Sequence, residues 1–81
     1  MIKIYSTSWC GPCASAKRLL DQLGQTYEEI DIEKEGISRQ DLQKITGGVT
    51  VPQIIINGNP IGGFDSLLKI NQDGTLKEML K

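Results

Sequence analysis

The sequence predicts one α/β domain spanning residues 1–81, a four-stranded mixed β-sheet flanked by helices in the order βαβαββα. Two segments with strand patterns are each followed by a helical pattern, and a β-branched run at 54–56 leads into a reversing turn. A chain of 81 residues, 38% of them hydrophobic, is large enough for only one core. The two βα units favour parallel pairing with helices on both faces, and the turn adds an antiparallel hairpin.

The first strand and the first helix lie on either side of two closely spaced cysteines. Residues 2–6 alternate between apolar and polar side chains, which is typical of a strand. From Pro12 onward the apolar residues have helical spacing, and Gly24 supplies the left-handed residue that commonly ends a helix. Apolar residues within 27–32 then indicate a second strand.

A short capped helix is predicted after the second strand. Ser38 and Asp41 have the spacing of a capping box, in which side chains and backbone N–H groups at the helix start satisfy one another. Leu42 and Ile45 form the apolar stripe that we expect to be buried. The glycines at 47–48 end the helix.

A hairpin follows this helix. The continuous β-branched run Ile54–Ile56 suits a buried central strand. The segment Asn57–Pro60 predicts a reversing turn, after which Ile61 begins the return strand and Gly62–Gly63 ends it.

Two helical stretches are predicted to close the chain. The first is polar-capped and runs from about residue 65 to residue 70, and the second begins with the capping-box spacing of Thr75 and Glu78. The apolar residues expected to face the core are Leu67, Leu68 and Ile70 in the first, and Leu76, Met79 and Leu80 in the second.

Charge and hydropathy exclude several classes of partner. Nine basic and ten acidic residues give a net charge of −1, without any run of like charges of the kind that binds nucleic acid. The first five residues contain no apolar core of a signal peptide, and no apolar stretch approaches the roughly 18 residues that a membrane span needs. We therefore expect a cytoplasmic monomer with no nucleic-acid or membrane partner.

The segment Cys10-Gly11-Pro12-Cys13 contains every cysteine of the chain. A structural zinc site needs four ligands, and a chain with two cysteines and no histidine cannot supply them, so we expect no metal site. A structural disulfide closing so short a loop would stabilise the fold by only roughly 2 kcal/mol and would be disfavoured in a reducing cytoplasm. A redox-active dithiol is the interpretation that explains both the spacing and the position.

Cys10 lies where the first helix begins. Unpaired backbone N–H groups and the helix dipole stabilise a thiolate there, so we expect the pKa of the Cys10 thiol to fall below its ordinary value of about 8.5. Cys10 is thus the predicted nucleophile. Cys13, almost one helical turn further on and more buried, is the predicted resolving thiol.

Three neighbours of the cysteines are predicted to support them. Gly11 permits a tight turn and close approach of a substrate backbone, and Pro12 fits the first helical turn, where no N–H partner is needed. Trp9 is the only tryptophan, and two interpretations stay open for it. It packs in the core, or it shields the sulfur and packs against a substrate.

Three segments in this order and at this spacing resemble the glutaredoxin family of the thioredoxin superfamily. They are the strand and dithiol from Ile4 to Cys13, the segment Thr50–Gln53, and the segment Ile61–Asp65. The resemblance covers nearly the whole chain. It implies a thioredoxin-like fold and thiol-disulfide oxidoreductase activity.

The resemblance also implies where substrates bind. In the family, a cis peptide bond before the proline of the second segment places a valine backbone beside the dithiol, here Val51-Pro52, and glutathione lies in a groove along the three segments. Glutathione would then be a co-substrate and reductant, with no cofactor bound. The matching groove positions are Thr50, Val51, Pro52, Gly63, Phe64 and Asp65.

Two groove positions depart from the family pattern. Thr7 stands where many glutaredoxins have a lysine for the glycyl carboxylate, and Ser66 stands where a second acidic residue is common. Lys17 and Arg18 on the first helix are candidates to compensate, although solvent-face charge is the more typical role of such residues.

The dithiol itself departs too, because Gly11-Pro12 is the thioredoxin form of the tetrapeptide. Two hypotheses about the reductant follow. The first is a glutathione-dependent enzyme that reduces disulfide-containing or glutathionylated proteins, and the second is a redoxin reduced by thioredoxin reductase, with ribonucleotide reductase among its clients. A third reading, a binding module for an iron–sulfur cluster shared by two chains, is disfavoured by Pro12.

Overall fold

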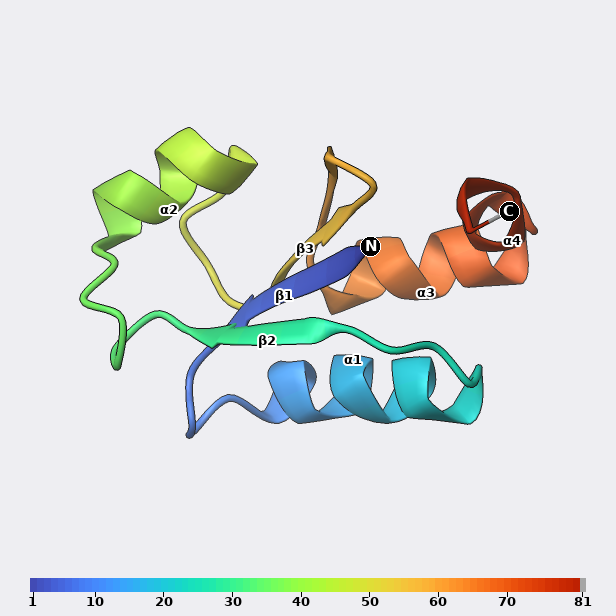
Figure 1. The fold of residues 1–81 in the computed structure, drawn as a ribbon, viewed down its shortest axis with the longest axis horizontal. Helices are drawn as coiled ribbons and strands as arrows, with labels where there is room; N and C mark the ends of the chain where they lie inside the picture. The colour runs from blue at the N-terminus through green and yellow to red at the C-terminus, as the bar shows by residue number, and fades with distance from the viewer. Residues whose placement is uncertain (81) are drawn as a thin grey trace.

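The computed structural model describes residues 1–80, so Lys81, the last residue of the predicted domain, lies outside the described residues. The strands are β1 (Ile2–Ser6), β2 (Glu28–Asp31), β3 (Gln53–Ile56) and β4 (Asn59–Gly62). The helices are α1 (Gly11–Gln22), α2 (Arg39–Thr46), α3 (Phe64–Gln72) and α4 (Thr75–Met79). The predicted order holds, with the closing helical region formed by the two expected stretches, α3 and α4 (Figure 1).

The four strands form one mixed sheet in the order β2-β1-β3-β4. β1 pairs in parallel with β2 and antiparallel with β3, and β4 returns antiparallel beside β3. The predicted parallel pairing and hairpin are both confirmed. Because β1 and β2 run in the same direction, their carboxyl ends meet at one end of the sheet, where the loop to α1 begins.

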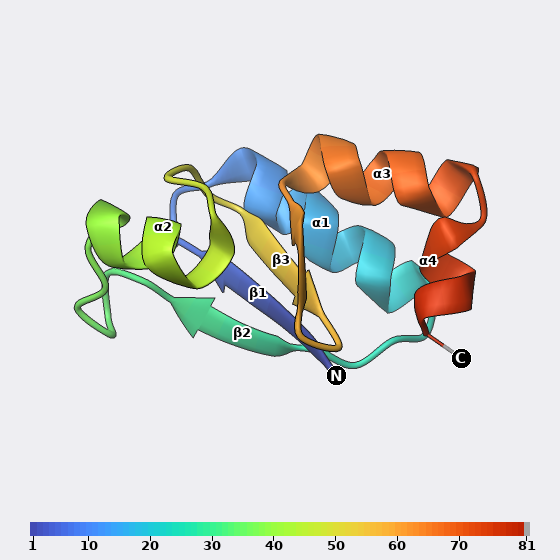
Figure 2. The ribbon, with the colours of Figure 1, turned by 90° about the horizontal axis from the view of Figure 1, so that it is seen from above.

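Two hydrophobic clusters lie on opposite faces of the sheet, because successive side chains of a strand point to opposite faces. Helices α1, α3 and α4 cover one face, and α2 covers the other (Figures 1 and 2). The first cluster contains Ile2, Ile4, Ala16, Leu20, Ile54, Ile56, Leu67 and Leu76. The second contains Tyr5, Ile32 and Leu42.

Helix α2 has the predicted capping box but a different buried face. The Asp41 N–H donates to Ser38 Oγ at 3.0 Å, and the Ser38 N–H donates to an Asp41 carboxylate oxygen at 3.3 Å. The prediction that Ile45 is buried is wrong, since its side chain is 43% exposed. Thr46, one turn after Leu42, is buried instead, and its hydroxyl donates to the Leu42 carbonyl at 2.8 Å.

The hairpin turn is tighter than predicted. Asn57 and Gly58 alone form it, both with positive φ (51° and 84°), so β4 begins at Asn59 rather than at Ile61. Such a two-residue turn matches the twist of the paired strands. Pro60 is tolerated because β4 is an edge strand, where a missing N–H interrupts no ladder.

The two C-terminal helices begin differently from the prediction. Gly63 precedes α3 and has no side chain to cap it, so the predicted polar cap is wrong. Thr75 is the first residue of α4 rather than its cap, and its N–H donates to Asp73 Oδ1 at 2.9 Å. Leu68 and Ile70 are half-buried rather than buried. Across residues 1–80, no helix is both long and apolar enough to span a membrane.

Candidate active site

The two cysteines occupy the start of α1 and form a disulfide, with Cα atoms 5.2 Å apart. Cys10 is the N-cap residue, and its Sγ accepts the Cys13 N–H at 3.1 Å, so the sulfur takes the place of a capping oxygen. Cys13 is fully buried, whereas Cys10 is half-buried. A thiolate at Cys10 would meet a backbone donor and the positive end of the helix dipole. The geometry therefore suits attack by Cys10 and resolution by Cys13.

The segment Thr50–Pro52 comes from the far side of the sheet to lie beside Cys10. The Val51-Pro52 peptide bond is cis, as the resemblance implied. The Val51 carbonyl oxygen is 3.6 Å from Cys10 Sγ. Since Pro52 leads directly into β3, the sheet holds the Val51 backbone at a defined position next to the reactive sulfur.

A groove of about 570 Å³ runs from this point along the start of α3. Its lining consists of Pro12, Ser15, Thr50, Val51, Pro52, Gly63, Phe64, Asp65 and Ser66. All six positions inferred from the family pattern therefore lie together. Ser15 was missed, although it follows Pro12 by three residues and so shares its face of α1.

The far end of the groove is the N-terminus of α3. No side chain caps this helix, so the N–H groups of its first turn are available to a ligand carboxylate. Gly62 allows the chain to enter the helix here with φ +111°, and a Cβ at this position would lie 3.0 Å from Ser66 Oγ. A side chain at residue 62 would thus strain the backbone and crowd the groove.

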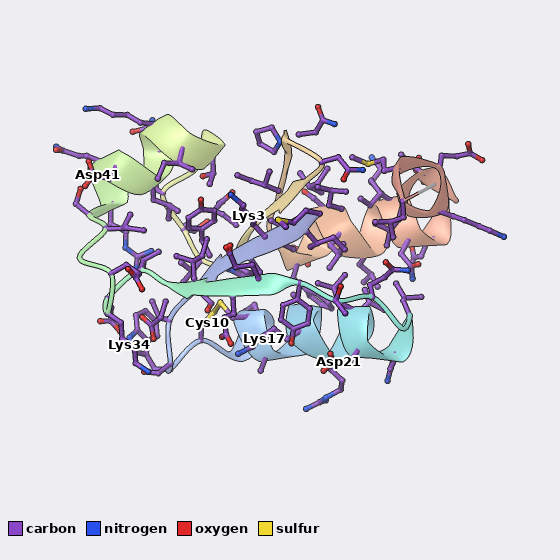
Figure 3. The ribbon with its side chains drawn as sticks, viewed as in Figure 1. Lys3, Cys10, Lys17, Asp21, Lys34 and Asp41 are labelled. Atoms are coloured by element: carbon purple, nitrogen blue, oxygen red, sulfur yellow. A yellow bond between two sulfur atoms is a disulfide. The ribbon has the colours of Figure 1, made fainter. Side chains whose placement is uncertain are left out.

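Lys17 does not face this groove. Its Nζ forms an ion pair with Glu29 of β2 at 2.6 Å, and the buried Ser6 hydroxyl donates to the same carboxylate at 3.1 Å. The hydrogen bond from Lys17 holds the pKa of Glu29 below its usual range, with burial opposing it and Ser6 supporting it. Figure 3 shows Lys17 on α1, beneath the β2 ribbon in this view. The suggestion that Lys17 replaces the missing groove lysine is therefore wrong.

Two arginines lie nearer to the groove. Arg18 is exposed and lines a hollow between α1 and α3 that shares Ser15 and Phe64 with the groove. Arg39, which the sequence analysis missed, donates from Nη1 to the Val49 carbonyl at 3.0 Å and so braces the loop that carries Thr50. Nothing in the spacing of Arg39 pointed to this contact, because it depends on how the 47–50 loop folds back over α2.

The remaining predicted residues separate into buried and exposed positions. Thr7 is only 3% exposed, and its backbone carbonyl accepts the Cys10 N–H at 3.4 Å. Its hydroxyl has no hydrogen-bond partner within residues 1–80. Trp9 is 65% exposed, so the core interpretation of it is wrong. Gly11 and Pro12 are exposed beside the disulfide.

Known proteins match this chain in sequence along nearly all of its length. The family model described as Glutaredoxin matches residues 2–61. The chain is 42% identical to Glutaredoxin-C6 of Oryza sativa subsp. japonica, over 98% of this chain and 73% of that protein. It is 36% identical to Glutaredoxin 3 of Escherichia coli (strain K12), over 99% of this chain and 96% of that protein.

Solved structures agree with the sequence comparison. The crystal structure of a buckwheat glutaredoxin–glutathione complex superposes with a TM-score of 0.88 at 37% identity, covering 98% of this chain and 74% of that one. The solution structure of glutaredoxin from Brucella melitensis superposes with a TM-score of 0.84 at 36% identity, covering 99% and 87%.

Proposed function

This chain belongs to the glutaredoxin family and is a thiol-disulfide oxidoreductase, and from this premise we propose that it reduces protein disulfides and glutathione mixed disulfides with glutathione as reductant. The observation that carries the proposal is the groove that starts beside Cys10 and ends at the uncapped N-terminus of α3. The proposal includes a role in electron transport and cell redox homeostasis in the cytoplasm.

In the proposed reaction, the Cys10 thiolate attacks one sulfur of the substrate disulfide. A new disulfide forms at Cys10, the substrate disulfide breaks, and the leaving thiolate takes a proton from water. For a protein disulfide, the Cys13 thiolate then attacks Cys10, releasing the reduced substrate and leaving the Cys10–Cys13 disulfide. For a glutathione mixed disulfide, a free glutathione thiolate instead attacks the glutathione sulfur of the Cys10–glutathione disulfide, so that oxidised glutathione forms and the Cys10 thiolate leaves.

The groove chemistry supports glutathione as the ligand. A backbone carbonyl 3.6 Å from the sulfur and unpaired N–H groups at α3 suit a peptide with a terminal carboxylate. A related buckwheat protein was crystallised as a glutathione complex. Thr50, Val51, Pro52, Gly63, Phe64 and Asp65 are the proposed binding positions.

The alternative reductant is thioredoxin reductase, with ribonucleotide reductase among the clients. The thioredoxin-like Gly11-Pro12 pair favours it, and so does Thr7, which is buried and brings no positive charge to the groove. Consumption of NADPH through a purified thioredoxin reductase, with no turnover by glutathione, would support this alternative.

The deciding experiment is turnover of a glutathionylated peptide with glutathione as the only reductant. We expect turnover by the wild type and by Cys13→Ser, because resolution by a second glutathione needs only Cys10. Cys13→Ser should lose the reduction of protein disulfides, and Cys10→Ser should lose both activities. Equal loss of both activities in Cys13→Ser would contradict the division between the two thiols.

A further inference from the structure

The groove lies on only one side of Cys10. Its lining comes from the start of α1, the segment before β3 and the start of α3, and the last two adjoin β3 and β4 on one side of the sheet. The opposite edge is β2, and the loop that follows β2 contacts Trp9. A glutathionylated protein has two halves joined at the disulfide. If its glutathione half fills the groove, its protein half must lie on the side of Trp9.

Trp9 lies on the surface, where a partner can contact it, and not in the core. Trp9 is 65% exposed in the position directly before Cys10. The indole Nε1 donates to Glu33 Oε1 at 3.0 Å, which fixes the ring against the β2–α2 loop, residues 32–38. An exposed aromatic ring that is already held in place loses little conformational entropy when a partner packs on it.

The surface beside the ring carries negative charge. Glu33 is exposed, and its second carboxylate oxygen makes no hydrogen bond within the described residues. Asp31 adjoins it, since the Asp31 carboxylate accepts the Glu33 N–H at 3.0 Å, and Lys34 is the one cation of the segment 31–37. Figure 3 shows Lys34 at the same end of the molecule as Cys10. A partner with a Lys or Arg side chain matches this surface in charge, and a cation can also pack on the indole face.

We propose that Trp9 and Glu33, the Trp9–Glu33 surface, bind the protein half of a glutathionylated client and favour clients with Lys or Arg beside the modified cysteine. This inference rests on the proposed glutathione-dependent activity and adds the substrate class. When Cys10 attacks the glutathione sulfur, the Cys10–glutathione disulfide forms, the client–glutathione disulfide breaks, and the client thiolate leaves across this surface. The reductant is one free glutathione, whose thiolate attacks the glutathione sulfur of the Cys10–glutathione disulfide; oxidised glutathione leaves with the unit that came from the client, and the Cys10 thiolate is restored.

The test compares two glutathionylated peptides that differ only in having two lysines or two glutamates beside the cysteine. We expect the wild type to favour the lysine peptide roughly tenfold in kcat/KM at low salt, and addition of about 0.5 M salt to remove most of this preference. Glu33→Gln keeps an acceptor for the indole but loses the charge, so the preference should fall to about threefold or less.

Glu28→Gln is the matched control, because it removes the same charge from the opposite end of β2. We expect it to keep the wild-type preference. A second readout is the fluorescence of Trp9, the only tryptophan, titrated with each intact peptide in the Cys10→Ser variant. The lysine peptide should change the signal at lower concentration than the glutamate peptide.

The outcomes separate this inference from the proposed function. Equal kcat/KM for the two peptides, or an equal loss of preference in Glu33→Gln and Glu28→Gln, would overturn the inference and leave glutathione dependence intact. Absence of turnover for every glutathionylated peptide would instead overturn the proposed function.

Discussion

At the scale of single residues, the two cysteines differ because of their positions in α1. The N-cap position exposes Cys10 to substrate and directs the Cys13 N–H at its sulfur, while the same helix carries Cys13 inward until it is fully buried. One helical turn is thus enough to separate the attacking sulfur from the resolving sulfur.

Arg39 is the residue whose removal best tests the loop at the groove. Arg39→Ala deletes the hydrogen bond to the Val49 carbonyl and a positive charge near Thr50. We expect kcat/KM for a glutathionylated peptide to fall about fivefold, mainly through KM, which corresponds to about 1 kcal/mol for one hydrogen bond of this kind.

Lys44→Ala on the same helix is the control for this prediction. Lys44 is exposed and lies in the last turn of α2, and its removal changes the net charge by the same amount. If both variants lose activity equally, the effect is one of general charge, and the bracing role of Arg39 is refuted.

At the scale of elements, the Lys17–Glu29 ion pair joins α1 to β2. The hydrogen bond from Lys17 lowers the pKa of Glu29 in the folded state. The pair therefore stabilises the fold at pH values above the ordinary Glu pKa of about 4.5. This contribution is lost as the pH falls below 4.5 and through the lowered pKa.

We therefore expect Glu29→Gln to be less stable than the wild type at pH 7 and to show a smaller decline of stability below pH 4.5. The difference at pH 7 should be less than about 1 kcal/mol, since both side chains are partly exposed and solvent screens the pair. Urea unfolding between pH 3 and pH 7 measures both quantities. An unchanged acid-side decline in Glu29→Gln would contradict the assignment.

The buried face of α2 is a second feature at this scale. Leu42→Ala should destabilise the protein by about 2–4 kcal/mol, because Leu42 is fully buried against Tyr5 and Ile32. Ile45→Ala should cost less than about 1 kcal/mol, since the Ile45 side chain is 43% exposed. Chemical denaturation of the two variants measures both free energies of unfolding. Similar losses of stability would contradict the assignment of Ile45 to the surface.

At the scale of the whole molecule, a chain of 81 residues divides its apolar side chains between two faces of one sheet. Each core is consequently small, and few side chains can be removed without unfolding. Leu20 belongs to the cluster that α1 covers. Leu20→Ala should lower the free energy of unfolding by about 3 kcal/mol, a large share of the roughly 5–15 kcal/mol that is typical of a domain.

Leu23→Ala provides the matched control, because Leu23 follows the same helix but is partly exposed. Its loss should be below about 1 kcal/mol in urea unfolding. Equal unfolding midpoints for the two variants would mean that the α1 face of the sheet does not carry the stability assigned to it.

The sequence by itself determined the α/β class, the strand and helix segments and the dithiol. These features depend on patterns within a few residues of one another: alternation in 2–6, the capping box of Ser38, and two cysteines three residues apart at a helix start. Local patterns failed where neighbouring residues could serve the same purpose. In α2, Thr46 is buried in place of Ile45, and before α4 the Asp73 side chain accepts the Thr75 N–H, although Thr75 was the predicted cap.

Only the tertiary structure gave the contacts around Cys10 and Trp9, although the family resemblance had already implied that Val51 lies beside the dithiol. Val51 is 41 residues away from Cys10, and Glu33 is 24 residues away from Trp9. Lys17 was one candidate for the groove, and the parallel pairing of β1 with β2 instead places Glu29 beside it. The physical reason is that these contacts form only when the sheet and its crossing helices close together, and no spacing within one segment encodes that closure.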